Sequence, residues 1–171
     1  MLLQLFSHQP TALTLPNKMV YLPGTGFVPF QQAFTDAQLD QAYNELITVG
    51  VHGTIFKEGV FGNFYACVDS IIRHDEPLYL AAILKHRGTS FFFSSYPILA
   101  AELNRAGCLS VMGAYGISLN QTASGGEDSP SIPPPLVYAA INNDYPSLEV
   151  LAMYNAIHTV GDHYVCAAIF A

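Results

Sequence analysis

The chain has 171 residues, of which 51% are hydrophobic and 11% charged, and its formal net charge is −7. This composition is ample for one buried core and excludes disorder of the whole chain. Six Lys and Arg against thirteen Asp and Glu, with no basic cluster, oppose binding to nucleic acid. No apolar run reaches the roughly 18 residues that span a membrane, and the apolar start of the chain lacks the basic residue of a signal peptide. We expect a soluble protein without a membrane partner.

The three cysteines, at positions 67, 108 and 166, have no CxxC spacing. An odd number without this spacing indicates neither a disulfide framework nor a cysteine zinc site. We therefore expect reduced, buried thiols in a cytoplasmic setting.

Residues 1–26 contain Pro10, Pro16 and Pro23, followed by Gly24 and Gly26. Proline and glycine at this density interrupt helices and strands. The pattern predicts an N-terminal leader or cap, extended and without a regular element, in front of a second region at 27–171.

Beyond the leader, one short phrase recurs five times. It begins at Pro29, Asn63, Pro97, Pro135 and His163 and closes on the small residues Ala33, Cys67, Ala101, Ala139 and Ala167. The closing residues follow one another at steps of 34, 34, 38 and 28 residues, and periods of roughly 20–50 residues are typical of stacked supersecondary units. We expect these small residues to occupy one equivalent position, at which two helices pack closely.

The apolar spacing after each phrase predicts a pair of short helices joined by a polar turn. In the first unit Asp36 is expected to break the helix, and the later turns contain His74 and Asp75, Asn104, and Asn143. A left-handed residue is expected to close each unit, and these residues are Gly50, Gly88, Gly116 and Asn155. The predicted units are about 27–60, 61–94, 95–131 and 132–160, with a partial unit at 161–171.

The phrase Pro135-Leu136-Val137-Tyr138-Ala139-Ala140, followed by a Leu-rich segment and Asn155-Ala156, resembles the ankyrin repeat. Residues 97–101 are similar to it as well, although no unit has the complete Thr-Pro-Leu-His tetrad. The long glycine-containing connections at 51–62 and 117–134 favour ankyrin units over tetratricopeptide units. The resemblance implies an all-α, ankyrin-like solenoid that uses its loops and concave helix face to bind a protein.

Candidate contact residues follow from that resemblance, at loop tips and at outer positions of first helices. They are His52, Thr54, Phe56, Phe91, Phe92, Phe93 and Tyr138. Aromatic residues in loops are common binding anchors. For the three consecutive phenylalanines the alternative stays open that they fold back over the ends of the flanking helices.

Chemistry has little support in the sequence. Cys67 or Cys108, with His52, His74 or His86 as a base, is the alternative hypothesis of a small hydrolase or transferase, but no motif of a reactive cysteine accompanies them. His158, Asp162 and His163 crowd one loop without a fourth ligand nearby, and no GxGxxG or GxxxxGK[ST] loop is present. We predict no enzyme, no cofactor and no metal.

The leading hypothesis is therefore a protein-interaction module, a scaffold, a regulator or a bacterial effector. Its acidic surface predicts a partner that is basic or mixed in charge. The apolar end at Ile169 and Phe170 adds self-association through the C-terminal end as a further expectation. We expect the protein in the cytoplasm, or delivered into a host cell if it is an effector.

Overall fold

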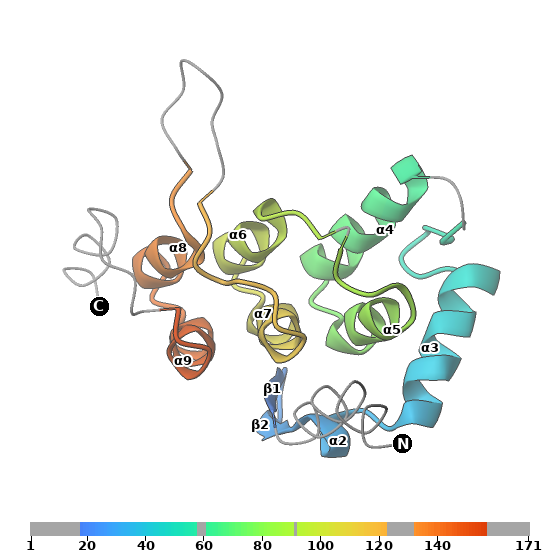
Figure 1. Cartoon of the computed structure of the whole chain (residues 1–171), viewed down its shortest axis with the longest axis horizontal. Coiled ribbons are helices and arrows are strands. Elements are labelled where there is room, and N and C mark those ends of the chain that lie inside the picture. The colour runs from blue at the N-terminus through green and yellow to red at the C-terminus, as the bar shows by residue number, and fades with distance from the viewer. Residues whose placement is uncertain (1–17, 58–60, 91, 123–131, 157–171) are drawn as a thin grey trace, which may run out of the picture.

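The computed structural model describes residues 18–57, 61–90, 92–122 and 132–156, and within them helices dominate (Figure 1). The elements in chain order are β1 (Met19–Leu22), β2 (Gly26–Pro29), α2 (Phe30–Ala33), α3 (Asp36–Thr48), α4 (Phe61–Arg73), α5 (Pro77–Arg87), α6 (Ser95–Glu102), α7 (Ala106–Ala114), α8 (Pro135–Ile141) and α9 (Tyr145–Met153).

The two strands form an antiparallel hairpin in which Val20 lies opposite Val28. Its turn needs left-handed backbone at Gly24, with φ of 81°, which glycine adopts without a Cβ clash. The prediction that residues before 27 hold no regular element is therefore wrong for residues 19–26. The hairpin also runs across the position at which the sequence divides a leader from the second region.

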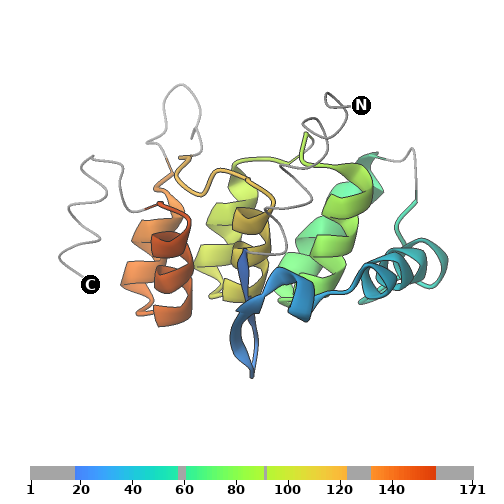
Figure 2. The ribbon, with the colours of Figure 1, turned by 60° about the horizontal axis from the view of Figure 1, so that its bottom comes forward.

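Helix α3 begins where the sequence predicted a break. The side chain of Thr35 accepts a hydrogen bond from the backbone N–H of Gln38, and the Gln38 side chain accepts one from the N–H of Thr35. This capping box satisfies donors that the first turn of a helix leaves free, so Asp36 starts α3. Helix α2 is a single turn, and α3 lies across the direction of the later helices (Figure 2). The first predicted unit therefore differs from the others.

Helices α4 to α9 form three pairs, each joined by a tight turn. The pairs α4–α5, α6–α7 and α8–α9 stand next to one another, because α4 contacts α6, α6 contacts α8, α5 contacts α7 and α7 contacts α9. The first helices of the pairs make one row and the second helices another (Figure 1). Large apolar side chains between the rows form a continuous core that runs through all three pairs.

The three turns have the same backbone geometry. Each contains one non-glycine residue in the left-handed region, namely Asp75, Asn104 and Asn143, with φ of 50°, 61° and 53°. In each turn the next N–H donates to the carbonyl five residues earlier, as in Glu76 to Ile71, Arg105 to Ala100 and Asp144 to Ala139. The pairs are thus related by a defined register, and the predicted closing residues Gly50, Gly88, Gly116 and Asn155 all have positive φ.

This register corrects the alignment drawn from the sequence. Counting back from the turns, Ile71, Ala100 and Ala139 are equivalent, and each is almost fully buried. Cys67 instead corresponds to Tyr96 and Pro135, eight residues before each turn. The recurrent phrase therefore lies at different distances from the turn in the first helices, because α4 starts more residues before its turn than α6 and α8 do.

The N-terminal segment covers the row of second helices. Strand β1 packs on α7 and α9, and α3 packs on α5. The N–H of Tyr21 donates to Ser110 Oγ at 2.8 Å, and the Tyr154 hydroxyl donates to the carbonyl of Met19. Val20 is fully buried between these contacts. This face of the helix pairs is consequently part of the core and not a free surface.

Candidate protein-contact surface

The row of first helices presents an open face within the described part of the chain. Equivalent positions five residues before each turn hold Ser70 on α4, Leu99 on α6 and Tyr138 on α8, and all three are half-buried. Ile141 at the end of α8 is 54% exposed. A face that repeats the same partly exposed position on three parallel helices is suited to contact an extended partner surface.

Four aromatic residues gather at one end of this face, and we call them the aromatic patch: Tyr65, Phe92, Phe93 and Tyr96. The ring of Phe93 stacks on the rings of Tyr65 and Tyr96, with distances between ring centroids of 4.9 and 5.8 Å. The rings of Phe92 and Tyr96 are in contact, with their centroids 4.8 Å apart. Phe93 is nevertheless 50% exposed, whereas Tyr96 is buried. The patch thus combines a fixed ring arrangement with an exposed apolar anchor.

Charged groups lie next to the aromatic patch and follow it along α4 and α6. Asp69, one turn after Tyr65 on α4, accepts a hydrogen bond from Arg73 Nε at 2.6 Å. Burial raises the pKa of Tyr96 to about 12, and the negative charge of Asp69 adds to this effect. The hydrogen bond to Asp69 raises the pKa of Arg73, and the negative charge of Glu102, at the corresponding position on α6, adds a smaller contribution. Asp69, Arg73 and Glu102 thus bring two carboxylates and one guanidinium to this side of α4 and α6.

The predicted contact residues fall into different environments. Phe93 and Tyr138 lie on the open face, and Phe92 packs against the core as part of the aromatic patch. Phe91 lies outside the described residues. Phe56 is only 2% exposed, with the Arg87 guanidinium over its ring, so it is a core residue and not a contact residue. The structure thus divides the predicted loop aromatics between core and surface.

His52 and Thr54 belong to a small loop after α3. The loop is closed by backbone hydrogen bonds between Val51 and Thr54. The imidazole of His52 stacks on that of His74, with the ring centroids 3.7 Å apart. The Nε2 atom of His52 lies 3.0 Å from Glu76 Oε1. These contacts hold the loop against the α4–α5 turn, away from the aromatic patch on α4 and α6.

The two described cysteines are packing residues. Cys67 is 1% exposed, and burial raises the pKa of its thiol to about 11. Cys108 is fully buried, and burial, together with the nearby carboxylate of Asp75, raises the pKa of its thiol well above the ordinary value. Its Sγ faces the carbonyl of Ile71. Such surroundings oppose the thiolate that a nucleophile needs, and they give the cysteine-enzyme hypothesis no support.

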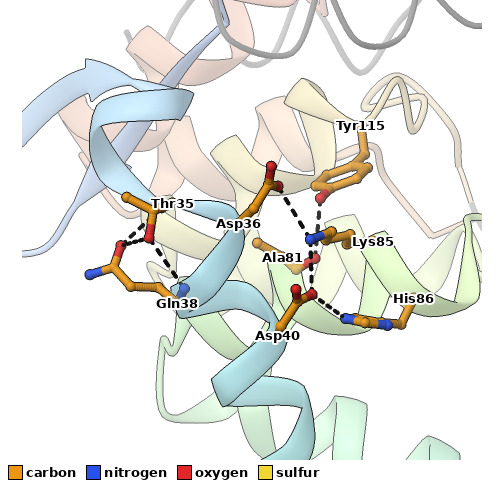
Figure 3. Close-up of polar contacts among 8 residues, drawn as sticks. All are labelled: Thr35, Asp36, Gln38, Asp40, Ala81, Lys85, His86 and Tyr115. Carbon is orange, nitrogen blue, oxygen red and sulfur yellow. Dashed lines mark hydrogen bonds and ion pairs between the residues drawn. The ribbon is translucent and has the colours of Figure 1, made fainter.

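Sequence reasoning missed a polar network between α3 and α5 (Figure 3). Lys85 Nζ lies 3.2 Å from Asp36 and 2.9 Å from Asp40, and His86 Nε2 lies 3.0 Å from the same Asp40 oxygen. The hydrogen bond from Lys85 holds the pKa of Asp40 below its usual value. The charged residues at the end of α5 and the start of α3 were the available signal, but their pairing depends on how α3 crosses α5.

No protein-family model, curated protein sequence or solved structure matches this chain. Within the described ranges, no helix is both long and apolar enough to cross a bilayer. The same residues contain no group of three or more His, Cys, Asp or Glu side chains that could hold a metal ion.

Proposed function

We propose that this chain is a non-catalytic protein-interaction module built from ankyrin-like helix pairs. One observation carries the proposal: β1 and α3 cover the second helices α5, α7 and α9, while the described part of the chain leaves the outer side of α4, α6 and α8 open. The face formed by the second helices is thus used for the core, and the face formed by the first helices is available for contact with a partner.

The character of the open face supports this function. Partly exposed apolar groups at Leu99 and Tyr138, together with Phe93 and Ile141, alternate with polar side chains along it. Interfaces with a partly apolar centre and a polar rim are typical of protein recognition. Short helices fixed by repeated turns also present a rigid surface, so little ordering is needed on binding.

Charge supports a partner that is basic or mixed. The basic groups of Lys85 and Arg73 are already paired with carboxylates of the chain. With a net charge of −7 for the whole sequence, the remaining surface charge is predominantly acidic. Such a surface accelerates encounter with a basic partner, and added salt weakens the effect.

Site-directed photo-crosslinking tests the proposal. A benzoylphenylalanine placed at Tyr138 probes the open face, and the same group at Tyr145, which is 68% exposed on α9, is the matched control. We expect one protein from cells of the source organism to cross-link at position 138 and not at 145. A partner that cross-links only from position 145 would place recognition elsewhere, and adducts of the chain with itself would identify the partner as a second copy.

A further inference from the structure

We infer that the aromatic patch, together with Asp69 and Glu102, binds a peptide segment in which a Lys or Arg side chain lies next to an apolar one. This inference rests on the proposed function and names the partner chemistry for one end of the open face. The apolar side chain would contact Phe93, and the cationic group would lie toward the two carboxylates.

The exposed ring of Phe93 is held in place before any ligand arrives. It stacks on Tyr65 at an interplanar angle of 28° and on Tyr96 at 29°. Tyr96 belongs to α6 and is buried, whereas Tyr65 belongs to α4, so two helices of the fold support the ring. An anchor that is already ordered loses little conformational entropy on binding, and burial of its exposed half is then mostly favourable.

The carboxylates determine the sign of the ligand's charge. Asp69 accepts a hydrogen bond from Arg73 through Oδ2, and within the described residues its Oδ1 has no hydrogen-bond donor. Glu102 has no ion pair within 4.0 Å among the same residues. The three groups sum to one negative charge, which favours a cationic side chain and disfavours an acidic one. The alkyl stem of Lys or Arg can also lie on aromatic rings while its head reaches a carboxylate.

Arg73 opposes the binding of a cation at this site. Its guanidinium is bonded to Asp69 and would repel a second cation. Replacing it by Gln removes this repulsion and releases Asp69 for the ligand. The proposed site therefore predicts a substitution that strengthens binding, which an unspecific apolar surface does not.

A random dodecapeptide library displayed on phage and panned against the whole chain is the probe. We expect enriched peptides with Lys or Arg within two residues of an aromatic or aliphatic residue. A synthetic copy of the leading peptide, measured by fluorescence anisotropy, should bind about tenfold more weakly to the Phe93→Ser and Asp69→Asn variants. The Arg73→Gln variant should bind it more tightly, and Tyr145→Ser, an exposed aromatic outside the patch, should leave the affinity unchanged. Circular dichroism of each variant checks that the fold is retained.

Three outcomes overturn the inference: no enriched peptide, enriched peptides without a cationic residue, or affinity that is indifferent to Phe93→Ser. Cross-linking from Tyr138 would still stand in each case, so failure here is distinguishable from failure of the proposed function. Loss of cross-linking at Tyr138 with peptide binding intact would instead restrict recognition to the aromatic patch.

Discussion

The carboxylate of Asp75 lies at the start of α7, where its Oδ1 accepts a hydrogen bond from the backbone N–H of Cys108 at 2.9 Å. Asp75 belongs to the turn between α4 and α5, so this bond joins one helix pair to the next. Its backbone is left-handed, and the equivalent residues of the next two turns are Asn104 and Asn143. An asparagine side chain tolerates this conformation and offers the same acceptor oxygen.

Substitution of Asp75 tests this link between pairs. Asp75→Asn keeps the acceptor for the Cys108 N–H, and we expect it to stay within about 1 kcal/mol of the parent in free energy of unfolding. Asp75→Ala leaves that donor unsatisfied and should cost roughly 1–3 kcal/mol. Urea unfolding at neutral pH measures both variants. Equal losses for Asn and Ala would mean that the hydrogen bond does not stabilise the junction.

The pH dependence of stability gives a second test at Asp75. Burial raises the pKa of this carboxyl above its ordinary value of 3.8, and the hydrogen bond from Cys108 only partly opposes the shift. A raised native pKa means that the folded protein binds the proton more readily, so this contribution is present below 3.8 and is lost as pH rises through the native pKa.

Asp75→Asn should therefore remove a fall in stability with rising pH just above 3.8. Asp40→Asn is the matched control, because Lys85 lowers the pKa of that exposed carboxyl. Its contribution is present above the ordinary pKa and is lost as pH falls, so removal of Asp40 should change the profile in the opposite sense. Thermal unfolding at several pH values decides between the two directions, and profiles that change alike would contradict the assignment for Asp75.

Local signals in the sequence located much of the helical region. Gly88, Gly116 and Asn155 were expected to close their units in left-handed backbone, and all three have positive φ. This conformation is costly for most other residues, so a glycine or asparagine after a helix is an informative signal in the sequence. The turns at Asp75, Asn104 and Asn143 were found because polar residues interrupt the apolar spacing there, but the left-handed backbone of these three residues was not predicted. The hairpin at 19–29 was missed because proline and glycine are common both in extended leaders and in tight turns, and therefore do not distinguish the two.

The candidate surface was predictable only in part. Phe93 was predicted as a contact residue because a run of aromatics in a loop is conspicuous, and its side chain is 50% exposed. Tyr65 on α4 gives no such signal in a single sequence. Phe56 was assigned to the surface because it lies in a glycine-rich loop, yet it packs against Phe64 and under Arg87. Which aromatic residue of a loop is buried depends on contacts with residues distant in sequence. The ion pair between Asp40 and Lys85 likewise depends on how α3 packs on α5.

The cap of α3 gives a prediction that concerns one hydrogen bond. Thr35→Ala removes the acceptor for the Gln38 N–H and should cost about 1 kcal/mol of unfolding free energy. Thr35→Ser keeps a hydroxyl at the same place (Figure 3) and should cost much less. The two variants are compared by chemical denaturation. Equal stability of the Ala and Ser variants would show that the capping box does not hold the start of α3.

Gly113 on α7 marks a close approach to Tyr154. A Cβ at this position would lie 2.5 Å from Cδ2 of the tyrosine ring, which is held by its hydrogen bond to Met19. Gly113→Ala would favour an isolated helix by about 1 kcal/mol, but the overlap should make the protein roughly 1–3 kcal/mol less stable.

A double-mutant cycle isolates that contact. In the background of Tyr154→Ala the ring is absent, so we expect Gly113→Ala to be neutral or stabilising. Unfolding free energies of the four proteins give the coupling, expected above about 1 kcal/mol. A coupling near zero would mean that α7 and α9 are not held at the distance described.

The reactivity of the cysteines separates a packing role from a catalytic one. Cys166 lies outside the described residues, so the Cys166→Ser variant leaves only Cys67 and Cys108 to react. Both are buried, and burial raises the pKa of each thiol; since the thiolate is the reactive form, we expect slow labelling in the native state. In denaturant both should react at once with Ellman's reagent at pH 8, a pH close to the ordinary thiol pKa of about 8.5. One cysteine that reacts in the native protein as fast as in the unfolded chain would contradict the packing role and revive the hypothesis of a cysteine nucleophile.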